Sequence, residues 1–185
     1  MSKPKVTGTK RQRDLEKRKK KHLKLQKRII KNSDKVISIY HGIGKIGPIS
    51  KLHDGLEDYH QVFFERDKNT EHFPVKGLRK FRDLSCEDQL LRVLTRGRQA
   101  LDLPRFESLE HRLNYLILSI EGQDIRDLVC AIIGFRNFKN LSSTERKLLV
   151  MAQNSLQLEI IHVLNISEDE AQNKLNKFLN QGSTY

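Results

Sequence analysis

The chain of 185 residues is 37% hydrophobic, so it can form one ordinary domain or two small ones with a modest core. It has no apolar run of about eighteen residues, and its first residues are charged throughout. We therefore expect neither a membrane-spanning helix nor a secretory signal. Cys86 and Cys130 lie far apart without CxxC spacing, which is typical of a reducing cytoplasm and excludes a disulfide scaffold.

The net charge of +12 comes from one end of the chain. Residues 1–31 hold fourteen Lys and Arg residues but only two acidic ones, Asp14 and Glu16. Residues 32–185 hold the other 21 basic residues together with 21 acidic ones, so they are neutral overall. The excess positive charge therefore belongs to a separate terminal segment.

Because like charges repel and oppose compaction, residues 1–33 are predicted to form a flexible basic tail. One interpretation is an electrostatic arm that neutralises nucleic-acid phosphates and releases their counterions. A second is a solubilising leader. A membrane-surface helix is disfavoured, because the apolar residues of the tail include no aromatic anchor. As an arm, the tail would bind DNA through its densest basic cluster, which is Lys17, Arg18, Lys19, Lys20 and Lys21.

Residues 34–84 have the pattern of a small β domain. Short runs rich in β-branched and aromatic residues alternate with turn signals at His41-Gly42, His53-Asp54-Gly55 and Asp67-Lys68-Asn69. Five short strands in about fifty residues predict a small, strongly bent sheet or barrel. The expected strands are residues 35–40, 45–50, 59–65, 71–75 and 80–84.

The glycine-rich stretch "HGIGKIGPIS", residues 41–50, raises the question of a phosphate-binding loop. Such a loop needs a following helix whose free N–H groups face the anion. Here β-type residues and a proline follow instead. We therefore interpret Gly42, Gly44 and Gly47 as providing turn dihedrals and close backbone approach in a compact sheet.

From residue 85 the apolar pattern changes to a helical period. Ser85 precedes acidic residues suited to a first helical turn, and Ser142-x-x-Glu145 and Ser167-x-x-Glu170 are capping-box patterns. Residues 85–180 are thus predicted to form an all-α bundle of about five helices, followed by a disordered end at 181–185. The fold class is α+β. The second and third helices should bury the faces Leu109, Leu113, Leu116, Ile117, Ile120 and Ile125, Leu128, Val129, Ile132, Ile133.

No arrangement of residues indicates catalysis. The four histidines of the β part, His41, His53, His60 and His72, lack metal-ligand spacing. The chain has no GxSxG nucleophile motif, and its acidic residues mostly fall in first helical turns, where they cap. We therefore predict a protein that is not an enzyme and uses no metal or cofactor.

The order of these segments resembles the CarD-like (CdnL) bacterial transcription regulators. "DKVISIYHGIGKIGPI" (34–49) is similar to the opening strands of that family, "DYHQVFFE" (58–65) to its tyrosine-led strand, and "HFPV" (72–75) to a strand ending in proline. "FRDLS" (81–85) matches the passage into the helices. The most specific similarity is residues 141–179, which resemble the LSxxE(K/R)xxLxxAxxxLxxELA segment followed by a short SxEEA helix.

The resemblance implies a Tudor-like five-stranded β-barrel that binds a lobe of the RNA polymerase β subunit through one exposed strand edge. The matching edge is Glu71, His72 and Phe73, where His72 replaces a common arginine; main-chain pairing tolerates such a change. It also implies double-stranded DNA binding by the helical domain. The basic residue after the capping Glu is Arg146, followed by Lys147, and free N–H groups of that first turn could hold a phosphate.

Two features depart from the family. Its members generally wedge a tryptophan against melted promoter DNA, but this chain contains no tryptophan. The corresponding place is near Ser108, and Phe106 is the nearest aromatic. Phe106 either stacks on an unpaired base or staples the following helix. The neighbouring basic pair is replaced by Glu110-His111, and the basic tail is an addition to the family pattern.

We therefore expect a noncatalytic, monomeric, cytoplasmic and nucleoid-associated regulator that binds polymerase and upstream promoter DNA and modulates open-complex stability. An architectural nucleic-acid-binding protein that no longer contacts polymerase is the alternative. A nuclease guided by the basic tail is a third class, disfavoured because clustered carboxylates are absent from the sequence.

Overall fold

The computed structural model describes six stretches of the chain. The predicted basic tail, the turn at residues 53–55 and the predicted disordered C-terminal end lie outside them. The described residues are 35–51, 58–74, 80–96, 106–122, 124–136 and 138–180.

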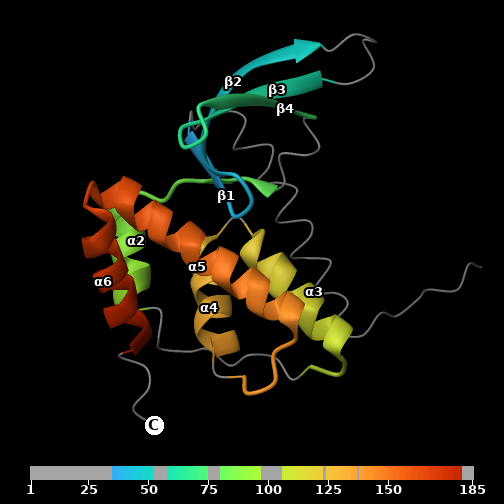
Figure 1. The fold of residues 1–185 in the computed structure, drawn as a ribbon, viewed down its shortest axis with the longest axis vertical. Coiled ribbons are helices and arrows are strands. Elements are labelled where there is room, and N and C mark those ends of the chain that lie inside the picture. Colours follow the sequence, from blue (N-terminus) through green and yellow to red (C-terminus); the bar gives the residue numbers. More distant parts are fainter. Residues whose placement is uncertain are drawn as a thin grey trace, which may run out of the picture.

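The N-terminal part of this structure is one antiparallel sheet of five strands (Figure 1). The order in space is β4-β3-β2-β1-β5, so β4 and β5 are the two edges. The five predicted strands are confirmed, although β2 begins earlier and β5 is shorter than expected. Their bounds are β1 Lys35–Ser38, β2 Gly42–Lys51, β3 Asp58–Phe64, β4 Asn69–Pro74 and β5 Arg82–Asp83.

The glycines serve the sheet as expected. Gly42, in the turn between β1 and β2, has a φ of 77°, a backbone angle that residues other than glycine rarely adopt. A Cβ atom at Gly44 would lie 2.6 Å from Cγ1 of Val62, so only glycine fits this close approach of β2 and β3. The β2–β3 register shifts between Ile46 and Ile49, which marks a bulge that bends the sheet.

The expectation of a barrel holds only loosely, because the sheet is strongly bent but not closed by main-chain hydrogen bonds. β4 and β5 are not paired with each other. Aromatic side chains fill the concave face instead, with the rings of Phe73 from β4 and Phe81 just before β5 at 4.9 Å between centroids. Phe64 and Phe81 are buried, and the ring of His41 stacks on Phe64 at 5.2 Å. Because β5 has two residues, it is too short to close the sheet against β4.

Among the residues that the structure describes, five helices follow the sheet, as predicted, and their apolar faces form a second core. Leu116, Ile120 and the face of the next helix are largely buried, but Leu109 is 58% exposed. The expectation that Leu109 is a core residue is therefore wrong, because it is the first residue of its helix and extends past the bundle. The bounds are α2 Glu87–Arg96, α3 Leu109–Ile120, α4 Ile125–Arg136, α5 Ser143–Leu164 and α6 Glu168–Asn180.

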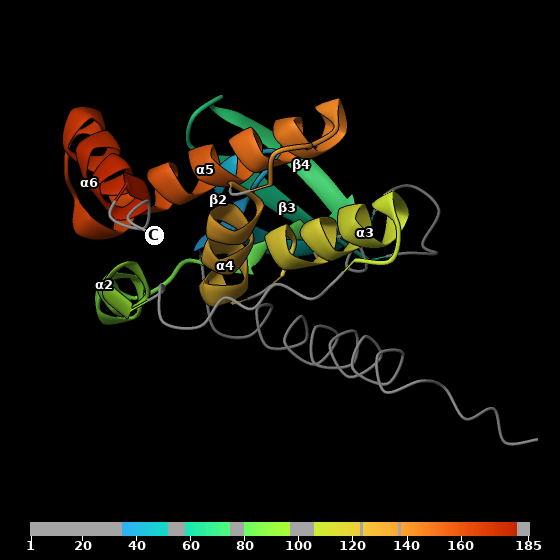
Figure 2. The ribbon, with the colours of Figure 1, turned by 90° about the horizontal axis from the view of Figure 1, so that it is seen from below.

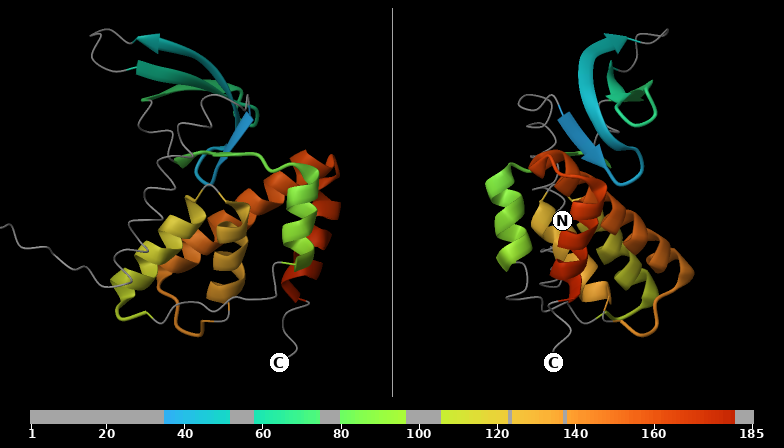
Figure 3. Two further views of the ribbon diagram at one scale, coloured as in Figure 1. Left: turned by 180° about the vertical axis from the view of Figure 1, so that it is seen from behind. Right: turned by 60° about the vertical axis from the view of Figure 1, so that its left-hand side comes forward.

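The long helix α5 organises the molecule. It contacts α2, α3, α4 and α6, and it also contacts β1 and β2. Figure 2 shows the structure from the helical side, with the sheet behind the helices, and Figure 3 shows the two layers from two further directions. The fold is therefore α+β, with a sheet and a helical bundle joined through one helix. None of the described helices is long and apolar enough to cross a membrane.

Candidate functional site

No described strand pairs with the outer edge of β4, here called the free edge, and this edge presents main-chain groups at alternate residues. The N–H of Glu65 donates to the carbonyl oxygen of Ile43 at 3.3 Å, so the main-chain groups of odd-numbered residues in β3 point toward β2. Those of even-numbered residues then point toward β4, where Val62 faces Glu71 and His60 faces Phe73. It follows that Glu71 and Phe73 bond back to β3, whereas Thr70 and His72 direct their N–H and C=O groups outward.

The side chains of the three predicted edge residues point to different faces. Phe73 belongs to the aromatic cluster on the concave face, and Glu71 lies on the same side, with its carboxylate 3.9 Å from Nδ1 of His41. Of the three residues, His72 is the most exposed, and Glu71 and Phe73 are half-buried. A partner strand at this edge would therefore meet the main chain and the imidazole of His72, while Phe73 packs into the aromatic cluster on the concave face.

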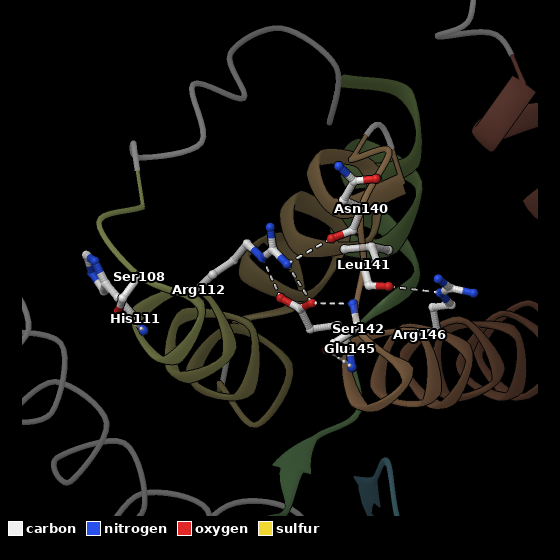
Figure 4. Close-up of polar contacts among 8 residues, drawn as sticks. All are labelled: Ser108, His111, Arg112, Asn140, Leu141, Ser142, Glu145 and Arg146. Carbon is white, nitrogen blue, oxygen red and sulfur yellow. Dashed lines mark hydrogen bonds and ion pairs between the residues drawn. The ribbon is translucent and has the colours of Figure 1, made fainter.

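The N-terminus of α5 is held by a buried charge cluster (Figure 4). Ser142 and Glu145 form the predicted capping box: the Ser142 N–H donates to Oε2 of Glu145 at 2.7 Å, and the Glu145 N–H donates to Oγ of Ser142 at 3.2 Å. The same carboxylate accepts two hydrogen bonds from Arg112 of α3, from Nε at 2.5 Å and from Nη2 at 2.8 Å. Nη2 also donates to the carbonyl oxygen of Asn140 at 3.0 Å.

This cluster fixes the protonation of both partners. Glu145 is fully buried, yet hydrogen bonds from Arg112, acting against the effect of burial, hold the pKa of its carboxyl below the ordinary value. Hydrogen bonding to Glu145 raises the pKa of Arg112 further. Arg112 is therefore occupied in joining α3 to α5, and it is not available to bind an anion from outside.

Arg146 and Lys147 lie next to this cluster and are both exposed. Nε of Arg146 donates to the carbonyl oxygen of Leu141 at 3.0 Å, which directs the side chain back over the start of α5 (Figure 4). The Glu145 N–H bonds to the Ser142 hydroxyl, and the Arg146 N–H bonds to the Ser142 carbonyl. The cap thus uses the Glu145 N–H, and the Arg146 N–H makes the first main-chain bond of the helix, which favours the basic side chains as the groups to bind a phosphate.

Phe106 lies close to this region but is half-buried. Its ring packs near Tyr115 at 5.4 Å, Phe135 at 5.7 Å and Phe138 at 5.9 Å between centroids. The stapling role is therefore present, since the ring fastens the segment before α3 to the bundle. Ser108 is the N-cap of α3, with its hydroxyl accepting from the His111 N–H at 3.0 Å. Stacking of Phe106 on a base stays a prediction.

Sequence reasoning missed a second buried ion pair, between Arg82 of β5 and Glu159 of α5. Nη1 of Arg82 donates to Oε1 of Glu159 at 2.8 Å, and Nη2 donates to Oε2. The Ser85 N–H also donates to Oε1, at 2.8 Å. Burial on its own would raise the pKa of Glu159, but the charge and hydrogen bonds of Arg82 and the Ser85 amide hold it below the ordinary value. One feature of the sequence could have indicated this buried pair: the carboxylate of Glu159 stands between the core residues Leu156 and Ile160.

Lys17, Arg18, Lys19, Lys20 and Lys21 lie outside the described residues. Within the described ranges, no group of three or more His, Cys, Asp or Glu side chains is arranged to hold a metal ion.

The geometry defines an α+β protein with a free strand edge at one end and a buried, charge-capped helix terminus at the other. Residues 121–176, which span α4, α5 and most of α6, match the family model described as CarD, C-terminal domain. This match supports CarD-like family membership through residues 121–176, which make up less than a third of the chain. No curated protein matches the chain as a relative.

Proposed function

We propose that this protein is a noncatalytic transcription regulator that binds the RNA polymerase β subunit and upstream promoter DNA, and modulates the stability of the open complex. The observation that carries the proposal is the family match over residues 121–176. The free edge of β4 and the exposed basic pair at the start of α5 supply surfaces of suitable chemistry for the two partners.

The polymerase contact is proposed to be main-chain pairing with β4. His72 directs its N–H outward, so His72→Pro should remove one donor for an added strand without breaking the ladder to β3. Binding to an isolated polymerase β fragment, measured by calorimetry, should weaken by at least about tenfold, which is about 1.4 kcal/mol. His72→Ala keeps the donor and is the matched control. Equal weakening by both variants would refute main-chain pairing.

DNA is proposed to contact Arg146 and Lys147. Removing one phosphate contact should reduce the slope of log affinity against log salt by about 1. Arg146→Ala and Lys147→Ala should therefore each weaken binding to promoter duplexes in a sequence-independent way. Arg126→Ala, at an exposed arginine on α4, is the control and should leave the slope unchanged.

The basic tail is proposed to supply nonspecific affinity for DNA, which compensates for the missing tryptophan. If it contacts about six phosphates, it accounts for a slope of about −5. Deleting residues 1–31 and titrating DNA binding against salt tests this proposal. A slope that does not change on deletion would exclude the tail, including Lys17 to Lys21, from DNA binding.

The alternative is an architectural nucleic-acid-binding protein without a polymerase contact. It is favoured by the absence of tryptophan and by the inward packing of Phe106. An empty pull-down with the polymerase β subunit would support it. Chromatin immunoprecipitation separates the two further, since a regulator should coincide with polymerase at promoters and an architectural protein should cover the chromosome evenly.

A further inference from the structure

The two proposed binding surfaces lie on different layers of the molecule. The β4 edge belongs to the sheet, whereas Arg146 and Lys147 lie at the start of α5. Glu159, near the other end of α5, is where this helix bonds to the sheet. At a rise of 1.5 Å per residue, Arg146 lies about 20 Å along the helix from Glu159. A rotation of α5 by about 10° about that point would move Arg146 by about 3.5 Å, close to the rise of one base pair.

The contact of Glu159 with Arg82 and Ser85, called the joint below, is suited to hold α5 in a fixed orientation relative to the sheet. Its two carboxylate oxygens are both used by Arg82, and one also accepts from the Ser85 N–H. Bidentate pairing of a guanidinium with a carboxylate fixes the relative orientation of the two planes as well as their separation. Arg82 is 4% exposed and Glu159 is 0% exposed, so water does not compete for these bonds. Arg82 is itself paired with Ile37 of β1, which ties the joint to the centre of the sheet.

Two less buried polar contacts accompany this ion pair, and one of them, between Lys35 and His162, also joins the sheet to α5. Oη of Tyr40 donates to Oε1 of Glu121 at 2.8 Å, and Nζ of Lys35 lies 3.1 Å from Nε2 of His162. Exposed polar pairs add little to stability and hold orientation weakly. The Arg82–Glu159 pair, whose side chains are more deeply buried, is therefore the better suited of these contacts to fix the angle between the sheet and α5.

A buried ion pair is a poor source of net stability. Apolar residues of similar volume are often as good or better, because both charges must be desolvated. What the ion pair adds instead is orientation, because its hydrogen bonds form only when the two groups face each other in one direction. On the basis of the proposed function, we propose that Arg82 and Glu159 are positioning residues that hold the β4 edge and the start of α5 in one fixed orientation, so that polymerase and DNA are bound at the same time.

The test uses the full-length chain and three variants. Arg82→Met with Glu159→Leu removes the directional bonds but keeps an apolar joint that can fold. Glu159→Gln keeps the shape and removes the charge. Glu170→Gln makes the same change at an exposed carboxylate on α6 and is the matched control.

The first readout is orientation, from backbone residual dipolar couplings. In the natural chain, the sheet and the helices should fit one alignment tensor; in the Met/Leu double variant they should need two. Two tensors in the natural chain would overturn the proposal without any variant, and one unchanged tensor in the double variant would also overturn it. This measurement needs no partner, so it tests the joint even if the protein proves to bind neither polymerase nor DNA.

The second readout is binding. Affinity for a polymerase β fragment alone, or for duplex DNA alone, should stay within about twofold in all variants. Affinity for the assembled polymerase–promoter complex should fall at least about tenfold in the double variant and in Glu159→Gln, because the gain from joined binding depends on geometry that allows both contacts. Unchanged affinity for the assembled complex would refute the positioning role. Failure of the natural chain to bind either partner would instead refute the proposed function.

Discussion

The buried cluster at the start of α5 predicts a large and specific loss of stability. Glu145→Ala removes two charged hydrogen bonds from Arg112 and one from the Ser142 N–H. It also leaves Arg112, which is 16% exposed, without its carboxylate. Breaking a buried ion pair by removing one partner costs about 3–5 kcal/mol, and loss of a cap alone costs about 1 kcal/mol. The expected loss of about 4 kcal/mol is a large share of a typical stability of about 5–15 kcal/mol.

The assay is urea unfolding followed by circular dichroism, with the midpoint compared at constant m-value. The melting temperature should fall by roughly 10 °C. Glu170→Ala is the control, because Ser167 and Glu170 form a similar cap in solvent with no arginine attached; its effect should be much smaller. Arg112→Met combined with Glu145→Met should recover much of the loss, since no charge is then left buried. If Glu145→Ala costs no more than Glu170→Ala, the reasoning about burial is wrong.

Three further outcomes follow from the structure. Gly44→Ala should destabilise the protein by about 1–3 kcal/mol in urea unfolding, because its Cβ would collide with Val62; a midpoint equal to that of the natural chain would contradict the close approach. Asn165, the C-cap of α5, has a φ of 51°, so Asn165→Ala should cost about 1 kcal/mol and Asn165→Gly should not; equal effects would exclude left-handed strain. Because the folded-state pKa values of Glu145 and Glu159 are both lowered, their stabilisation is complete above the unfolded value of about 4.3 and is lost as the pH falls through the lowered values. Urea midpoints should therefore drop on acidification below about pH 4.3, and less steeply in Glu159→Gln, whereas equal slopes would contradict the assigned pKa shift.

Local patterns were enough to predict most elements of the fold. The strands follow from β-branched runs between turn residues, and the capping box at Ser142 and Glu145 requires only residues three apart. Partners distant in sequence could not be predicted in the same way. Arg82 and Glu159 are 77 residues apart, and the sequence around each residue does not indicate which residue it pairs with. Arg112 was missed for a related reason, because the capping box already gave Glu145 a sufficient local role.

The sequence could name candidate site residues but not the geometry of their surroundings. The sequence indicated residues 71–73 as an edge, but the direction of each main-chain group depends on the register between β2 and β3, which a single hydrogen bond from Glu65 establishes. Likewise, the basic residues Arg146 and Lys147 could be located, but not the use of the neighbouring amides by the cap. Phe106 could be named as the aromatic nearest the missing tryptophan, but its packing against Phe135 is evident only from the three-dimensional structure.

The short length of β4 also bears on self-association. A strand edge that can pair with a segment of a partner protein can also pair with another copy of the same chain. Such pairing is the first step toward aggregation. β4 ends at Pro74, which has no N–H, and only Thr70 and His72 of this strand offer both a donor and an acceptor outward. Such an edge is long enough to bind a few residues of a partner and too short to template an extended stack of copies.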